Sequence, residues 1–301
     1  MNLKRHLTHQ WKIGSFVGYA VEFWEAEECK RFWEVVNNGD EGDDEGRGKV
    51  VVEVGEEDVT VSVADVQGGA PWGLDRIDQP ALPLSGDYDY PTQAGEGIDI
   101  YIVDTGIRTT HQDLAPRATF GTSTCRRCNG SETDDNGHGT HVAGIAAGTV
   151  YGAAKKANVI AVKCLDGRGR GPYSDLIDGL QWVAGRVGEG RRSVVNLSVQ
   201  GDTSTVLNRA VAGLAELGVF VVSAAGNFGE PACQYSPAAI TPTSSVISVG
   251  ATDQYDELGD FSNTGECVSV LAPGVDITSL DYETDDGTRT LSGTSMAAPH
   301  G

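Results

Sequence analysis

Three segments of this 301-residue chain carry side chains that can do chemistry together. Asp104 ends the apolar run IYIVD, His138 stands between two glycines in NGHGTH, and Ser295 follows Gly-Thr in SGTSMAAP. A serine hydroxyl is a weak nucleophile that needs a base, an imidazole can take its proton, and a carboxylate can orient the imidazole. The three residue types therefore indicate nucleophilic attack by Ser295, with His138 as the base and Asp104 as its support.

Each segment also has another interpretation when it is taken alone. Asp104 can be a turn or helix N-cap residue, and Asp-Thr-Gly is also the signature of aspartic proteases. Those enzymes need two such aspartates, whereas this chain has one Asp-Thr-Gly. His138 and His141 have the spacing of a zinc-binding pair, but a zinc site needs a third ligand and usually a glutamate base. Ser295 can simply cap a helix.

The sequence around these residues predicts the elements that position them. Apolar, β-branched runs predict strands over residues 98–104, 158–165, 193–199, 218–225 and 246–252. Apolar periodicity predicts helices over 174–187 and 205–217, with Ser174 as an N-cap and Gly218 just after the second helix. This alternation predicts an α/β fold with a parallel sheet, helices on both faces, and chemistry at the carboxyl ends of the strands.

The order of the three segments carries a family resemblance. From APWGLDRID at Ala70 to Gly301, the chain resembles the subtilisin-like serine proteases, and within them the proteinase K and aqualysin branch. The resemblance includes YGAAKKANVIAVK, SAAGN and YSPA. It implies a three-layer α/β/α fold with a mainly parallel central sheet. It also implies a serine endopeptidase that forms an acyl-enzyme intermediate, with broad specificity and an apolar P1 residue. The alternatives are a catalytically silent relative that acts as a binding module and an inactive fragment.

The resemblance also assigns residues that bind the substrate. It implies that Asn227 in SAAGN donates to the oxyanion together with the backbone N–H of Ser295, although this asparagine can also be a turn residue. Gly169, Arg170 and Gly171 match the family's edge strand, which pairs with an extended peptide. The walls of the P1 pocket match Ser198, Val199, Gln200, Gly201, Ala225 and Gly226, and its base matches Ala232. The glycines at 169 and 171 can also belong to a flexible loop, while a nucleotide-binding turn lacks a third glycine. Gln200 stands where the family has glycine, so its bulk narrows the pocket or hinders pairing with the peptide.

Residues 1–64 lack the alternation of apolar strands and helices that the rest of the chain shows. The pattern indicates a strand over 15–23, a short helix over 25–36, an acidic, glycine-rich loop over 37–48, and one or two strands over 49–63. This part weakly resembles the second half of the family's inhibitory pro-segment, which implies an intramolecular inhibitor that ends near Ala64-Asp65 and a peptidase domain over 65–301. We also expect natural sequence before Met1 and after Gly301. The family has a long helix after the nucleophile, so we expect poor hydrolysis by these 301 residues alone.

Charge and cysteines indicate the surroundings in which the protein works. A net charge of −21 argues against nucleic acid and anionic membranes as partners. The family resemblance implies polypeptide substrates, and we expect a monomer. The resemblance implies secretion and a Cys233–Cys267 bridge, while Asp135 and Gly167 replace a second family bridge. Among the other cysteines, Cys125 and Cys128 form a C-x-x-C in a predicted loop, which favours a local disulfide over a metal-binding or redox role. Cys164 lies on a predicted apolar strand, so we expect a buried thiol. The chemistry needs no cofactor. Structural calcium is expected only weakly, because Ser269 replaces a carboxylate of the family's strongest site.

Overall fold

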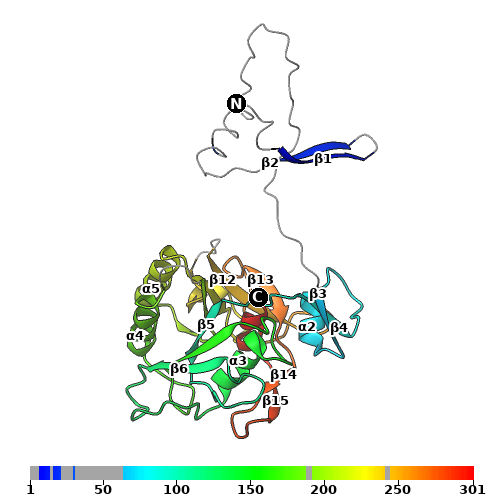
Figure 1. Ribbon diagram of the computed structural model, residues 1–301. Helices are drawn as coiled ribbons and strands as arrows, with labels where there is room; N and C mark the ends of the chain where they lie inside the picture. Colours follow the sequence, from blue (N-terminus) through cyan, green and yellow to red (C-terminus); the bar gives the residue numbers. More distant parts are fainter. Residues whose placement is uncertain (1–6, 14–15, 22–29, 31–63, 188–191, 241–244) are drawn as a thin grey trace. The chain divides into compact units, whose positions relative to one another are not determined.

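The computed structural model describes residues 7–13, 16–21, 30, 64–187, 192–240 and 245–301. The chain divides into two units, Met1–Ser62 and Val63–Gly301. In the first unit, β1 (Leu7–Ile13) and β2 (Phe16–Val21) form an antiparallel hairpin (Figure 1). The sequence predicted β2 but not β1. The predicted loop over 37–48 and strands over 49–63 lie outside the described residues, as does the predicted helix over 25–36 apart from Lys30.

The second unit is built on one seven-stranded sheet. Its order is β13-β12-β10-β8-β5-β7-β6, and every neighbouring pair is parallel. The five central strands were predicted, with ends that differ by one or two residues: β5 (Asp99–Asp104), β7 (Asn158–Lys163), β8 (Ser193–Leu197), β10 (Phe220–Ala224) and β12 (Val246–Thr252). The two edge strands, β6 (Ala118–Ser123) and β13 (Val270–Pro273), were not predicted. β6 (ATFGTS) mixes polar and apolar residues, and β13 (VLAP) is apolar but only four residues long, too short a run to stand out as a strand.

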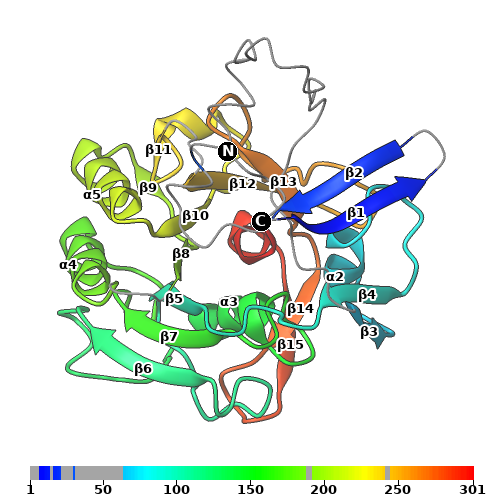
Figure 2. The same cartoon turned by 45° about the horizontal axis from the view of Figure 1, so that its top comes forward.

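Helices cover both faces of this sheet, as predicted (Figure 2). On one face, Ile100 and Ile102 of β5 share a buried cluster with residues of α3 (His138–Ala147). On the other face, Tyr101 and Val103 pack with α4 (Tyr173–Ala184) and α5 (Thr205–Glu216). Because successive side chains of a strand point to opposite faces, β5 contributes to two cores. The result is the predicted three-layer α/β/α arrangement, with α6 (Thr294–Ala297) and the short helix η3 (Ala298–His300) near α3.

The helix ends agree with the sequence at one of two predicted positions. Gly218 follows α5 with a left-handed φ of 84°, which is the conformation expected just beyond a helix. The prediction that Ser174 caps α4 is wrong. Pro172 occupies the N-cap position, and the restricted φ of its ring, −72°, leads the chain into the helix at the next residue. Ser174 therefore lies in the first turn, where its hydroxyl accepts a hydrogen bond from Arg126.

Two-stranded antiparallel sheets and short helices complete the second unit. They are β3 (Ala64–Gly68) with β4 (Asp87–Pro91), β9 (Gly201–Asp202) with β11 (Tyr235–Ser236), β14 (Ile277–Leu280) with β15 (Thr288–Leu291), α2 (Trp72–Ile77) and η2 (Ala232–Gln234). Among the helices in the described part of the chain, none is long and apolar enough to cross a membrane.

Candidate active site

Asp104 and His138 meet at the carboxyl end of the sheet. Asp104 is the last residue of β5 and is fully buried, and its Oδ1 accepts a hydrogen bond of 2.7 Å from the backbone N–H of Thr105. His138 is the first residue of α3. Its Nδ1 lies 2.8 Å from Oδ1 and 2.9 Å from Oδ2 of Asp104. The carboxylate therefore fixes the plane of the imidazole and faces one of its two nitrogens.

The glycines on either side of His138 make this approach possible. Gly137 has a left-handed φ of 99°, which a residue with a side chain rarely adopts. A Cβ on Gly139 would lie 2.2 Å from the carbonyl oxygen of Gly106, so a larger residue would push α3 away from the end of β5. The two glycines therefore allow the start of α3 to lie directly against the end of β5.

The charge of His138 is stabilised by its surroundings. Burial alone would lower the pKa of its imidazole, but the negative charge and hydrogen bond of Asp104 outweigh burial and raise that pKa above its ordinary value of 6.5. Asp134 raises the pKa further, while Arg289 opposes this shift. An imidazolium at this position is therefore favoured, which suits a group that must hold a proton between two steps.

Asp134 joins α3 to the end of β5 and was missed by the sequence analysis. This buried carboxylate accepts hydrogen bonds from the hydroxyl of Thr105 at 2.8 Å, from the backbone N–H of Gly137 at 2.9 Å and from the hydroxyl of Thr140 at 2.6 Å. The hydroxyl of Thr105 in turn accepts from the N–H of Gly139 at 2.9 Å. An acidic residue shortly before a helix was the available signal, since carboxylates favour helix N-termini.

Ser295 lies in the first turn of α6 and is half-buried. Its hydroxyl donates to the carbonyl oxygen of Ser198 at 3.3 Å, and the hydroxyl of Ser198 donates to the carbonyl oxygen of Ser295 at 2.8 Å. Asn196 donates to the Ser198 hydroxyl at 2.9 Å. In this resting arrangement the Ser295 hydroxyl bonds to the Ser198 carbonyl, and it must leave this contact to reach His138.

Asn227 is held with its amide nitrogen toward Ser295. Its Oδ1 accepts from the backbone N–H and the hydroxyl of Thr294, at 2.8 and 2.9 Å. The carboxamide oxygen is therefore occupied, and Nδ2 remains as a donor. A Cβ built on Gly293 would lie 3.7 Å from both Nδ2 of Asn227 and the backbone nitrogen of Ser295. Nδ2 of Asn227 and the backbone nitrogen of Ser295 therefore lie near one point beside Gly293, which Sδ of Met296 also approaches.

The structure brings together most of the other predicted substrate-binding positions. Ala225 and Ala232 are fully buried in the same small cluster, and Gly201 begins β9 directly after Ser198, Val199 and Gln200. Gln200 reaches across to Asn227, where its Oε1 accepts from the backbone N–H at 2.6 Å, and Gly226 lies next to this contact. The remaining positions form a separate loop. Gly169 and Arg170 lie in a turn that the Asp166 N–H closes by donating to the Arg170 carbonyl at 3.0 Å, and Gly171 follows it.

The five cysteines in the described part of the chain pair as predicted. Cys233–Cys267 and Cys125–Cys128 are disulfides, and Cys164 is a buried free thiol. Burial raises the pKa of the Cys164 thiol to about 12, so it stays protonated.

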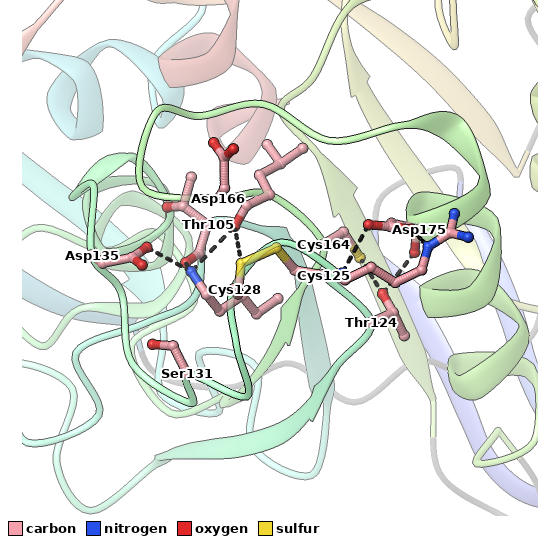
Figure 3. The surroundings of a disulfide bond; sticks show 12 residues. Thr105, Thr124, Cys125, Cys128, Ser131, Asp135, Cys164, Asp166 and Asp175 are labelled. Carbon is pink, nitrogen blue, oxygen red and sulfur yellow. Dashed lines mark hydrogen bonds and ion pairs between the residues drawn. A yellow bond between two sulfur atoms is a disulfide. The ribbon is translucent and has the colours of Figure 1, made fainter.

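Asp135, at a position where the family resemblance implies a bridge, forms an ion pair with Lys163 instead. Figure 3 shows the Asp135 carboxylate near Thr105. The Nζ of Lys163 lies 2.7 Å from Asp135 Oδ1, and it also donates to the carbonyl of Thr105 at 2.5 Å. Lys163 is fully buried at the end of β7, beside Asp104 at the end of β5. This ion pair therefore ties the loop before His138 to the residue that follows Asp104. The sequence analysis missed it, because Lys163 reads as the polar end of an apolar strand.

His141 has a structural environment. It is fully buried, and its Nε2 lies 3.0 Å from the carbonyl oxygen of Arg289. Burial lowers the pKa of His141 to about 4, so the side chain is neutral at pH 7. Within the described residues, no group of three or more His, Cys, Asp or Glu side chains is arranged to hold a metal ion.

This chain is similar to known proteins of one family. The sequence model of the subtilase family matches residues 95–300. Subtilisin-like protease 3 of Pseudogymnoascus destructans is 41% identical over 98% of this chain and 70% of its own length. The extracellular serine proteinase of Thermus sp. is 46% identical over 81% of this chain and 58% of its own length. Proteinase T of Parengyodontium album is 44% identical over 81% of this chain and 82% of its own length.

A solved structure shows the same fold. The crystal structure of a cold-adapted subtilisin-like serine proteinase superimposes with a TM-score of 0.72 at 42% identity, and covers 77% of this chain and 82% of that one. The predicted subtilisin-like fold is therefore confirmed. With a family match over most of its length and relatives that are named serine proteases, the chain belongs to the subtilase family of serine endopeptidases.

Proposed function

We propose that this protein hydrolyses peptide bonds with Ser295 as nucleophile, His138 as general base and acid, and Asp104 as the group that orients His138. The observation that carries this proposal is the pair of contacts, 2.8 and 2.9 Å, from Nδ1 of His138 to the two oxygens of buried Asp104. With Nδ1 held as a donor to the carboxylate, Nε2 is the nitrogen that accepts a proton. The raised pKa of His138 supports the imidazolium that this transfer forms.

The reaction proceeds in two halves. Ser295 Oγ attacks the carbonyl carbon while Nε2 of His138 takes the hydroxyl proton, and the oxyanion receives hydrogen bonds from Nδ2 of Asn227 and the N–H of Ser295. The C–N bond then breaks, His138 gives its proton to the leaving amine, and an acyl ester remains on Ser295. Water that loses its proton to His138 hydrolyses this ester. The Ser295 hydroxyl must first turn from Ser198 toward His138, which is common because catalytic hydrogen bonds tighten when substrate binds.

The substrates are polypeptides with an apolar residue at P1. The small side chains of Ala225 and Ala232, both fully buried, support a pocket of this character. The loop of Gly169, Arg170 and Gly171 pairs with the extended peptide backbone, a mode in which main-chain hydrogen bonds supply affinity. No cofactor takes part in these steps, and calcium bound elsewhere would act on stability.

Residues 1–64 act as an inhibitory pro-segment that is removed near Ala64-Asp65 in a secreted protein. Support comes from the family resemblance of this part, from two disulfides, and from a relative that is named an extracellular proteinase. Amino-terminal sequencing of the processed protein tests the boundary. A mature start beyond Trp72 would contradict it.

A fluorophosphonate probe tests the nucleophile and separates an enzyme from a silent binding module. It should label the chain at Ser295, and Ser295→Ala should abolish labelling. His138→Ala should slow labelling strongly, because the serine then lacks its base. Ser292→Ala is a matched control, since this exposed neighbouring serine bonds only to Asp276 among the described residues. Labelling that persists in Ser295→Ala, or a folded full-length protein that stays unlabelled, would refute the proposal.

A further inference from the structure

Two segments of the chain have the sequence Asn-X-Ser that N-linked glycosylation requires. They are Asn129-Gly130-Ser131 and Asn196-Leu197-Ser198. The modification attaches a bulky, hydrophilic oligosaccharide to the asparagine carboxamide, so a modified asparagine must face solvent in the folded protein. The motif alone does not separate the two segments, but their positions in the fold do.

Asn196 is inside the protein. It lies on β8, the strand between β5 and β10, and only 2% of its surface is exposed. Its Nδ2, the atom that would carry the sugar, donates to the hydroxyl of Ser198 at 2.9 Å. That hydroxyl is engaged with the carbonyl of Ser295 at 2.8 Å. A glycan at Asn196 would displace the centre of the sheet, so this segment cannot be modified in the folded chain.

Asn129 is at the tip of an exposed turn. It lies in the loop between β6 and α3, immediately after the Cys125–Cys128 disulfide, and both Asn129 and Gly130 are exposed. Its carboxamide makes no hydrogen bond to any residue that the structure describes. A Cβ built on Gly130 would meet nothing within 4 Å, which shows open space beside the asparagine.

The backbone presents this asparagine outward. Asn129 and Gly130 have left-handed φ values of 50° and 77°, and the N–H of Ser131 donates to the carbonyl of Cys128 at 2.9 Å. This hydrogen bond closes a turn with Asn129 and Gly130 at its two central positions, where side chains point to solvent. The disulfide ties the start of the turn to the protein. Figure 3 shows Ser131 beyond the disulfide, apart from the hydrogen-bonded cluster of Thr105 and Asp135.

We propose that Asn129 is a site of N-linked glycosylation and that Asn196 is not. The donor is an oligosaccharide linked to a lipid diphosphate. The bond from its first sugar carbon to the diphosphate breaks, a bond from that carbon to Nδ2 of Asn129 forms, and Nδ2 loses a proton. Two disulfides place the chain in an oxidising compartment, which is where such transfer occurs in secreted proteins.

The test is secretion of residues 1–301 from a eukaryotic host behind a cleavable leader, followed by peptide mass spectrometry. The leader directs the chain to the secretory route, so the outcome does not depend on the proposed protease activity. Peptide-N-glycosidase in ¹⁸O-water should convert Asn129 to ¹⁸O-labelled Asp in most molecules and leave Asn196 unlabelled. Because Asn-Gly pairs deamidate spontaneously, a digest without the glycosidase is the necessary control.

Variants give a second measurement on gels. Asn129→Gln and Ser131→Ala should each abolish the mobility shift that the glycosidase produces, whereas Ser131→Thr should keep it. Ser131→Thr is the matched control, because it retains the hydroxyl that the motif needs. An unmodified Asn129 peptide in the secreted protein, or a glycan at Asn196, would overturn the proposal.

Discussion

Replacing Gln200 by glycine should widen the pocket proposed for the P1 side chain. The Oε1 of Gln200 accepts a hydrogen bond of 2.6 Å from the backbone N–H of Asn227 and lies 3.1 Å from the position of a Cβ on Gly226. The side chain therefore connects the two segments assigned to the pocket walls, residues 198–201 and 225–226. A large P1 side chain that enters between them must displace this carboxamide.

The hydrogen bond sets the size of the effect. Breaking one neutral hydrogen bond of this kind costs about 0.5–1.5 kcal/mol. Since about 1.4 kcal/mol is tenfold in rate, a large P1 residue loses roughly 2- to 12-fold in kcat/KM. Gln200→Gly should remove this penalty, and the ratio of kcat/KM for P1 Phe over P1 Ala should rise by the same factor.

Chromogenic peptides that differ only at P1 measure this ratio. The ratio cancels differences in the amount of active enzyme between preparations. Gln112→Gly is the control, because Gln112 is an exposed glutamine on another loop. A ratio that is unchanged or lower in Gln200→Gly, or one that rises equally in Gln112→Gly, would refute the role assigned to Gln200.

Three further predictions concern the triad, a buried histidine and a disulfide. Asp104→Asn should lower kcat by about 10⁴-fold, and the activity that remains should reach half its plateau at lower pH, because Asp104 raises the pKa of His138 and the neutral imidazole is the base. Between pH 7 and pH 4.5 the free energy of unfolding should fall by about 2 kcal/mol more in the wild type than in His141→Gln, measured by urea denaturation. The sign follows because the folded pKa of His141, about 4, lies below its unfolded value, so stability is lost as pH falls through this window. Replacing Cys233 and Cys267 by serine should cost ~3–4 kcal/mol on the chain-entropy model, and an unchanged denaturant midpoint would contradict this.

The sequence by itself determined the layers of this protein and the identity of its reactive residues. Continuous apolar runs such as residues 98–104 are long enough to predict buried strands, and the apolar period of residues 205–217 predicts one face of a helix. These patterns involve residues close together in the chain, so they can be recognised without knowledge of the fold. The three reactive side chains were found because each sits in a short, distinctive segment, NGHGTH for His138 above all.

The tertiary structure decided which of these side chains touch, and which polar residues hold them. The carboxylate of Asp134 accepts a hydrogen bond from the Thr105 hydroxyl, and the ammonium group of Lys163 donates to the Thr105 carbonyl. The carboxamide oxygen of Gln200 accepts from the backbone N–H of Asn227. Each contact joins residues that are far apart in the chain, so no period or propensity encodes it. Such pairings follow from burial: once the parallel sheet brings strand ends together, a polar group without water must find a partner there.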